Sequence, residues 1–286
     1  MKAINAAFSH LNLLRQAENE LDDKYWKEPT SLNDILLSEP MLVKNYDELV
    51  RNVAQISYWN RNLMLYYRGQ SKDFMDHEQK STLLPSIYRS KADEAKRDIK
   101  HRFEVLDSCV KSLQASFSSH KLKIAGTHII HKFQEVSWAL LQHYEVCGTP
   151  LLDLTHSLHV ASSFAYHLGK KTGVVYVLAL PWMNDAIGYN SHEEIINLRL
   201  VSICPPQAQR PFFQEGYLAG QFPNYKLDAP KRSPQFDLSR RVIAKFCFDI
   251  NQDFWGSGFM NIPEDKLYPG NDVIGEICLR IREEMG

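Results

Sequence analysis

Residues 151–180, LLDLTHSLHVASSFAYHLGKKTGVVYVLAL, carry the clearest secondary-structure pattern in the chain. The pattern predicts a short strand over 151–155 and a helix over 157–168. Gly169 ends the helix, and the apolar run 173–180 predicts a second strand. A strand, a helix and a strand are therefore expected to follow one another here within 30 residues.

The rest of the chain mixes helical and extended patterns without the regular repeat of βαβ units. This order favours an α+β fold with a central mixed or antiparallel sheet and flanking helices. Residues 1–44 are polar and irregular and are expected to pack as an N-terminal arm on one domain, 45–286. Helices are expected over 46–59, 91–121, 133–146 and 273–284, and extended segments over 63–67, 196–204, 212–219 and 242–250.

The composition is that of an ordinary globular protein, with 44% hydrophobic and 23% charged residues. There are 33 Lys and Arg against 34 Asp and Glu, a net charge of -1. This balance excludes proteins that bind nucleic acid through a large basic surface. No apolar stretch approaches the ~18–20 residues of a membrane span, and the N-terminal residues lack the apolar region of a signal peptide. A soluble cytoplasmic protein is expected.

Five cysteines are spread widely along the chain, with no CxxC motif. Their odd number and spacing argue against a disulfide framework or a structural zinc site, and no metal is predicted. The P-loop, GxGxxG, HExxH and GxSxG motifs are also absent, which disfavours the common nucleotide-triphosphate, Rossmann, zincin and α/β-hydrolase classes. The cysteines are Cys109, Cys147, Cys204, Cys247 and Cys278.

The first group of candidate site residues is Arg68, Gly69 and Gln70, directly after the apolar run 63–67. The strand is expected to deliver them to its C-terminal end. A guanidinium there could bind a phosphate or carboxylate with two hydrogen bonds, and Gly69 would let backbone N–H groups approach the ligand. The alternative is a structural ion pair of Arg68 with an acidic residue such as Asp153.

The second group is His143 at a helix end and Asp153, Thr155 and Ser157 around a strand-to-helix turn. Asp153 and Thr155 share one side of the strand, and a carboxylate on an apolar strand must be paired or lie in a site. His143 could act as a general base or donate a hydrogen bond. Thr155 or Ser157 would cap the following helix. In the alternative reading Asp153 and His143 are structural residues.

The third group is Gln214 and Glu215, on an expected strand over 212–219. Neighbouring strand residues face opposite sides, so only one of the two can point into a given cleft. An inward Glu215 could act as a base or stabilise a cationic transition state. An inward Gln214 could only position a ligand by hydrogen bonds.

These groups, in this order, resemble the FRG domain, a family named for its (F/Y)RG motif. The resemblance spans about residues 45–280 and rests on ordered motifs. Those motifs are Tyr67-Arg68-Gly69, Leu84-Pro85-Ser86 with Arg89, Gln142-His143-Tyr144 with Thr149 to Thr155, Arg210 with Gln214 and Gly216, and Leu267-Tyr268-Pro269. The chain departs from the family at Glu145, where the family has Gly, and at Leu151, where it has Arg. The second departure removes one of two expected cations.

A weaker resemblance, to the Arg, Ser-Thr-Ser, Glu order of ADP-ribosyltransferases, implies a fold of that kind and a nucleotide-type substrate, NAD. Arg68 would then hold a phosphate, Thr155 or Ser157 would support the nicotinamide ribose, and Gln214 or Glu215 would meet the ribose hydroxyls. The activity would be ADP-ribosyl transfer to an unidentified macromolecular acceptor, or NAD hydrolysis, through a transition state that needs electrostatic stabilisation. Two alternatives remain: a non-catalytic ligand- or partner-binding module, and a nuclease or phosphodiesterase that uses His143 and Asp153.

Overall fold

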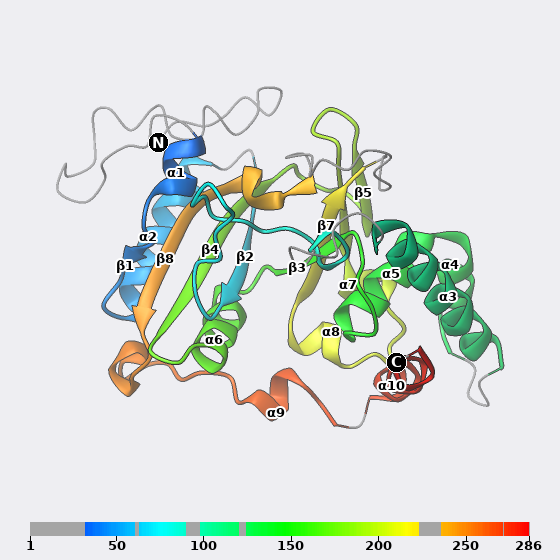
Figure 1. Cartoon of the computed structure of the whole chain (residues 1–286). Coiled ribbons are helices and arrows are strands. Elements are labelled where there is room, and N and C mark those ends of the chain that lie inside the picture. The colour runs from blue at the N-terminus through cyan, green and yellow to red at the C-terminus, as the bar shows by residue number, and fades with distance from the viewer. Residues whose placement is uncertain are drawn as a thin grey trace. The chain divides into compact units, whose positions relative to one another are not determined.

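A computed structural model describes residues 32–60, 63–89, 98–119, 124–222, 236–270 and 272–285 (Figure 1). The chain divides into two compact units, each assembled from three separate stretches of sequence. The first unit comprises Met1–Leu83, Thr155–Trp182 and Leu238–Glu264. The second comprises Leu84–Leu154, Met183–Asp237 and Asp265–Gly286.

The first unit is built on a mixed sheet with the strand order β1-β8-β4-β2 (Figure 1). The short strand β1 pairs in parallel with β8, whereas β8 with β4 and β4 with β2 are antiparallel. β4 is buried along nearly its whole length, as a central strand with both faces covered should be. The strands are β1 (Met41–Leu42), β2 (Met64–Gln70), β4 (Thr172–Leu180) and β8 (Val242–Asp249).

Helices of the first unit begin at side-chain caps that the sequence encodes. Asn45 accepts a hydrogen bond from the Glu48 amide at 2.9 Å and starts α2 (Tyr46–Trp59). Ser157 accepts one from the Val160 amide and starts α6 (Leu158–Leu168), which Gly169 ends as predicted. α6 packs on β2 and β4. The unit also contains α1 (Leu32–Leu37), a 3₁₀ turn at Leu238–Arg241 and another at Gln252–Trp255.

The second unit contains the strand order β3-β7-β6-β5 and most of the helices. β5 with β6 and β6 with β7 are antiparallel. The last residue of β3, Thr155, belongs to the first unit, where it pairs with Tyr67 of β2. The elements are a 3₁₀ turn at Ser86–Tyr88, α3 (Asp98–Ser119), α4 (Thr127–Lys132), α5 (Gln134–His143), β3 (Leu151–Thr155), β5 (Ile187–Asn190), β6 (Ile195–Arg199), α7 (Leu200–Ile203), α8 (Arg210–Phe213), β7 (Gly216–Gln221), α9 (Glu264–Leu267) and α10 (Val273–Met285).

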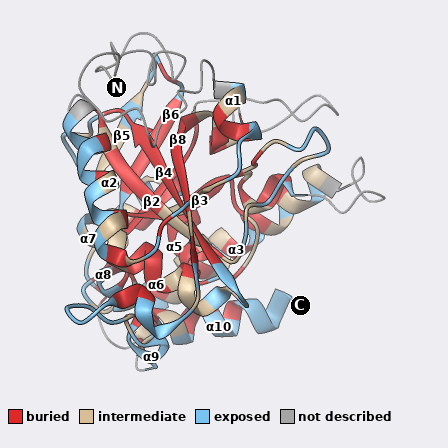
Figure 2. Ribbon diagram, turned by 90° about the vertical axis from the view of Figure 1, so that its left-hand side faces the viewer, coloured by how far each residue is buried: buried red, intermediate tan, exposed pale blue. Residues whose placement is uncertain are grey.

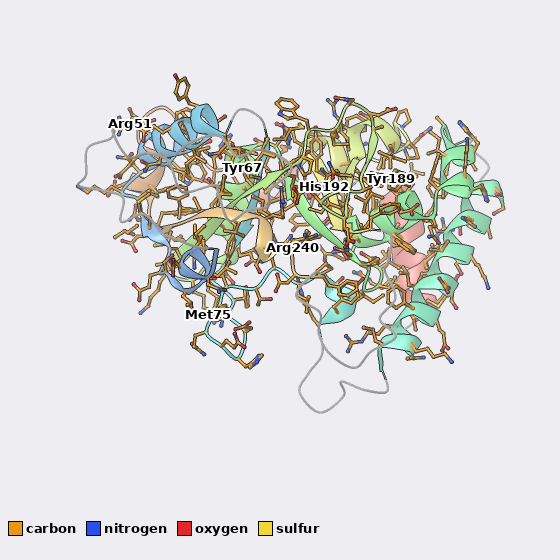
Figure 3. The ribbon with its side chains drawn as sticks, turned by 90° about the horizontal axis from the view of Figure 1, so that it is seen from above. Arg51, Tyr67, Met75, Tyr189, His192 and Arg240 are labelled. Carbon is orange, nitrogen blue, oxygen red and sulfur yellow. The ribbon has the colours of Figure 1, made fainter. Side chains whose placement is uncertain are left out.

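The long helix α3 turns its apolar stripe into the core of the second unit, as its sequence period predicts. Phe103, Leu106, Leu113 and Phe117 are buried there. Figure 2 shows the same alternation on α2 of the first unit, whose outer face is exposed while the strands behind it are buried. Figure 3 draws the side chains, with Tyr67 on β2 and Tyr189 on β5 labelled.

The α+β class and the mixed sheet are confirmed, as are the expected helices over 46–59, 133–146, 157–168 and 273–284 in most of their length. Residues 91–97 and 120–121 of the predicted 91–121 helix lie outside the described residues. Residues 1–31 of the expected arm lie outside them as well. The division into arm and domain stays a prediction. In the described residues, no helix is both long and apolar enough to cross a bilayer.

Three local predictions were wrong. β2 continues to Gln70, so Arg68 lies inside the strand rather than after it. The extended run expected over 196–204 ends at Arg199, where α7 begins. The run expected over 212–219 starts instead with the last turn of α8, and β7 begins only at Gly216. Pro211 at the start of α8 accounts for this difference, since proline suits the first helical turn.

Candidate functional site

Asp153 on β3 forms the centre of the main polar cluster in the second unit. Its Oδ2 accepts a hydrogen bond from Gln142 Nε2 at 2.8 Å, and its Oδ1 lies 3.2 Å from His143 Nδ1. Both partners stand at the C-terminal end of α5. The Asp153 side chain keeps 32% of its surface exposed. The carboxylate therefore joins strand to helix while one side of it remains open to solvent.

His143 is held in a defined orientation by Asp153. An ionised carboxylate at Nδ1 favours the tautomer with the proton on Nδ1, which leaves the lone pair on Nε2. The side chain is 4% exposed. Nε2 is buried and has no hydrogen-bond partner among the described residues. The His143–Asp153 dyad can therefore accept a proton at Nε2 and stabilise the imidazolium that results.

Glycine at position 216 gives the imidazole its room. A Cβ atom added to Gly216 would lie 3.1 Å from His143 Cε1 and 3.5 Å from Nε2. It would also lie 3.0 Å from Leu200 Cδ1 on the other side. The start of β7 thus forms the wall that the His143 ring contacts.

Gln142 has its side-chain amide oriented by two hydroxyl groups. Its Oε1 accepts hydrogen bonds from Ser86 Oγ and Thr149 Oγ1, each at 2.8 Å. Because these donors occupy the oxygen, the amide nitrogen must face Asp153. Ser86 Oγ in turn accepts the Thr149 backbone N–H at 3.0 Å. The network fixes the helix end, the loop before β3 and Asp153 in one arrangement.

Arg89 lies close enough to interact electrostatically with Asp153 and Asp237. Partial desolvation lowers the pKa of its guanidinium, and the two carboxylates oppose that shift. Its Nε donates to the Leu84 carbonyl at 2.7 Å. Arg89 thus supplies a cation beside Asp153 in a chain that has Leu151 where the family pattern has Arg.

The first unit contains the other half of the predicted residues. Arg68 is half-buried on β2 and stands opposite Tyr176 of β4. Gln70 is buried at the end of the same strand. Gly69 lies against α6, where an added Cβ would come within 1.9 Å of the Ala161 carbonyl oxygen. Glycine is therefore required at position 69 for packing of strand on helix.

Thr155 and Ser157 build the turn that starts α6. Thr155 Oγ1 accepts the Ser157 backbone N–H at 3.0 Å, and Ser157 Oγ accepts the Val160 N–H at 3.3 Å. Both hydroxyls are used locally, as in other capped turns. The expected cap is confirmed, with Ser157 as the capping residue.

Gln214 and Glu215 do not alternate along a strand, because both precede β7. Gln214 closes α8, is 5% exposed and donates from Nε2 to the Leu267 carbonyl at 2.8 Å. Glu215 is exposed at a φ of 44° in the turn that follows. Gln214 is therefore the inward residue of the pair, and Glu215 points to solvent.

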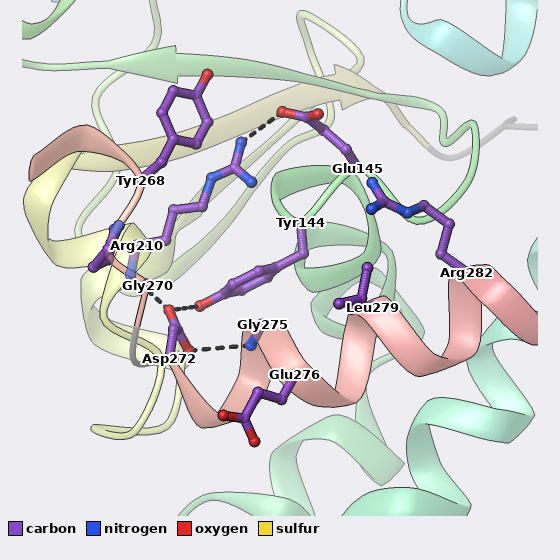
Figure 4. A pocket seen from close by; sticks show the side chains of 11 residues that line it. Tyr144, Glu145, Arg210, Tyr268, Gly270, Asp272, Gly275, Glu276, Leu279 and Arg282 are labelled. Atoms are coloured by element: carbon purple, nitrogen blue, oxygen red, sulfur yellow. Dashed lines mark hydrogen bonds and ion pairs between the residues drawn. The ribbon is translucent and has the colours of Figure 1, made fainter. Parts of the chain in front are cut away.

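A separate pocket of about 260 Å³ lies elsewhere in the second unit, and none of the predicted site residues lines it (Figure 4). Its walls come from the end of α5, the start of α8 and α10. The residues that bear its polar groups are Tyr144, Glu145, Arg210, Tyr268, Asp272, Glu276 and Arg282. Sequence reasoning did not find this pocket, although the motifs QHY and LYP and Arg210 all contribute to it.

The structure thus brings His143 and Asp153 together, and places Arg68, Gly69, Gln70, Thr155 and Ser157 in the first unit. The roles of Arg89 and Gln142 beside Asp153 were not predicted, although both belong to the motif blocks. Among the described residues, no group of three or more His, Cys, Asp or Glu side chains could hold a metal ion.

Comparison with known proteins gives one match. Residues 64–172 match the family model of the FRG domain. A search of curated proteins and a search of solved structures each found no match. The matched range includes Tyr67-Arg68-Gly69, His143 and Asp153, and it stops before Gln214 and Glu215.

Proposed function

The chain is an FRG-domain protein, and on that premise we propose that it cleaves the glycosidic bond of NAD, as a hydrolase or as an ADP-ribosyltransferase. The observation that carries the proposal is the His143–Asp153 dyad with its buried Nε2 atom. An oriented imidazole with an unsatisfied basic nitrogen suits proton transfer from a water or an acceptor hydroxyl.

NAD supplies the bond between C1′ of a ribose and nicotinamide, which leaves as a neutral base with the bonding electron pair. In hydrolysis, a water adds its oxygen to C1′ and gives its proton to His143 Nε2. Asp153 stabilises the resulting imidazolium through Nδ1. The products are ADP-ribose, nicotinamide and one proton, which His143 releases to solvent.

Arg68 is proposed as the residue that binds a phosphate of the substrate. Its guanidinium is half-buried, where an ion pair is screened less by solvent than on an open surface. Gln70, Thr155 and Ser157 keep their proposed supporting roles in the first unit. Gln214 or Glu215 is proposed to meet the ribose hydroxyls, and the exposed Glu215 carboxylate is the one available to stabilise positive charge.

The direct test is release of nicotinamide from NAD by the full chain, followed by chromatography. We expect His143→Asn to lower the turnover rate by about 10²–10⁴-fold, as loss of a general base does. We expect Arg68→Ala to weaken NAD binding by about 10–100-fold through loss of charged hydrogen bonds. The matched control is His101→Asn, an exposed histidine on α3 whose change should leave both measurements unaltered.

The proposal fails if the wild-type chain neither binds nor consumes NAD, alone or with added protein and small-molecule acceptors. It also fails if His143→Asn and His101→Asn turn over NAD equally fast. RNA and DNA incubated in parallel test the phosphodiesterase alternative, in which their cleavage would depend on His143 while NAD remained intact.

A non-catalytic binding module is the second candidate, and the Gln142 network favours it. Two hydroxyls and one carboxylate hydrogen-bond to that side chain and join a helix end to a strand. In this reading the wild-type chain does not turn over NAD, and Asp153→Asn lowers the melting temperature. In the enzymatic reading the same variant lowers turnover at a temperature where the protein is still fully folded.

A further inference from the structure

The pocket beside α10 surrounds an arginine whose hydrogen-bonding capacity is only partly used. The Arg210 guanidinium carbon lies 4.4 Å from the Tyr268 ring centroid and 5.8 Å from that of Tyr144. Its Nη2 atom lies 2.6 Å from Glu145 Oε1. The side chain is 15% exposed, and its Nε is buried with no hydrogen-bond partner among the described residues. A buried donor of this kind favours an acceptor ligand.

Asp272 is not available to be that acceptor, because its carboxylate is saturated. It is 4% exposed and accepts five hydrogen bonds, from the Tyr144 hydroxyl and from the backbone N–H groups of Gln209, Arg210, Ile274 and Gly275. These bonds tie the starts of α8 and α10 to Tyr144 (Figure 4). The walls around Arg210 are therefore fixed before any ligand binds.

Glu145 holds Arg210 only from the surface. Its side chain is 61% exposed, and an ion pair so open to solvent contributes little. Its backbone φ of 58° lies in the left-handed region that favours glycine. A glutamate is thus kept at an unfavourable backbone position, with its carboxylate turned toward Arg210 (Figure 4). Glu145 occupies the place that a ligand oxyanion would take.

We propose that this pocket binds the phosphate group of a small phosphate monoester, with Arg210 and Arg282 as its cations and Glu145 as an internal competitor. Both arginines line the pocket. A carboxylate ligand has no advantage in charge over the tethered Glu145 carboxylate. A phosphate dianion has three acceptor oxygens and can pair with both guanidinium groups at once. Glu276 also lines the pocket, and its negative charge weakens the binding.

Inorganic phosphate is the probe, because it carries the proposed group alone. Titration of the full chain at low salt is followed through the side-chain Nε–H signals of arginine in a proton–nitrogen NMR spectrum. We expect the Arg210 signal to shift with a dissociation constant in the millimolar range. Acetate at the same ionic strength should bind at least about tenfold more weakly, because it carries a smaller negative charge and fewer acceptor oxygens than phosphate.

Four variants decide the assignment. Glu145→Gln removes the competing charge and should tighten phosphate binding by about three- to tenfold, and Glu145→Gly should do the same while raising the melting temperature. Arg282→Ala should weaken binding by about three- to tenfold. Arg280→Ala, on the same helix but outside the pocket lining, is the matched control and should leave binding unchanged.

The proposal is overturned if phosphate shifts the arginine signals equally in the Arg280→Ala and Arg282→Ala proteins, or if neither change at Glu145 tightens binding. It is also overturned if acetate binds as well as phosphate. The Glu145 and Arg282 variants alter exposed side chains, so their results do not depend on a core change that could unfold the protein. The inference is independent of the proposed NAD cleavage, because His143→Asn should leave phosphate binding unchanged.

Discussion

Lys245 on β8 lies with its Nζ 2.9 Å from Asp73 Oδ2, and the two side chains are 1% and 7% exposed. Nζ also donates to Ser81 Oγ at 2.7 Å and to the carbonyl of Ser38. Asp73 Oδ1 accepts a further bond from the Tyr176 hydroxyl. A buried ion pair with all its hydrogen bonds made holds the segment after α1 and the loop after β2 onto the sheet of the first unit.

Removal of the lysine should destabilise the protein strongly, because it leaves an uncompensated carboxylate in the core. We expect Lys245→Met to lower the free energy of unfolding by about 3–5 kcal/mol. Lys245→Met combined with Asp73→Leu should recover part of that loss. Urea denaturation of the single and double variants measures both values. A single variant within about 1 kcal/mol of wild type would contradict this account.

Gly69 should tolerate no side chain, since a Cβ would come within 1.9 Å of a backbone oxygen of α6. We expect Gly69→Ala to reduce the yield of folded protein or to lower the melting temperature by roughly 10 °C or more. Gly258→Ala is the control in the same unit, because nothing lies within 4 Å of its added Cβ. Equal melting temperatures for the two variants would show that β2 and α6 can separate freely.

Gly216→Ala should displace the imidazole of His143 without removing any chemical group. Its Cβ would meet His143 Cε1 at 3.1 Å and Leu200 Cδ1 at 3.0 Å. We expect overpacking to lower the free energy of unfolding by about 1–3 kcal/mol. We also expect NAD turnover to fall at temperatures where the variant is still fully folded. Turnover measured well below the melting temperature separates the two effects. Unchanged turnover would mean that the position of the ring is not critical.

Stability should fall at alkaline pH because of buried tyrosines. Burial raises the pKa of Tyr67 from 10.0 to about 12, so the folded state favours the neutral phenol. That stabilisation is complete below pH 10 and is lost as the pH rises from 10 to 12. Tyr67→Phe cannot ionise and should reduce the fall in melting temperature over that range, while exposed Tyr58→Phe should not. Identical alkaline profiles for Tyr67→Phe and wild type would count against this assignment.

The sequence predicted the elements whose signals are local. The Asn45 cap with its following apolar period specified α2, and Ser157 with Gly169 specified both ends of α6. The predicted strand over 63–67 was too short, because Arg68 and Gly69 carry no strand preference of their own. Their extended conformation comes from pairing with β4, which lies far along the chain.

The polar sites were only half predictable for the same reason. His143 and Asp153 belong to one motif block, so their proximity could be expected. Arg89 interacts electrostatically with Asp153 from a segment far earlier in the sequence, and no spacing rule connects them. The pocket around Arg210 also depends on Asp272, which accepts hydrogen bonds from two segments far away in the sequence as well as from its own helix start.

The position of β8 within the first unit has a consequence for synthesis of the chain. β8 lies between β1 and β4 in the sheet, yet it is the last of these strands to leave the ribosome. Until then β4 exposes one unpaired edge and β1 has no partner in that sheet. The nascent chain must therefore carry an open edge from the synthesis of β4 until that of β8, a state prone to mispairing with other chains. Chaperone demand during expression should depend on how fast the stretch from β4 to β8 is translated.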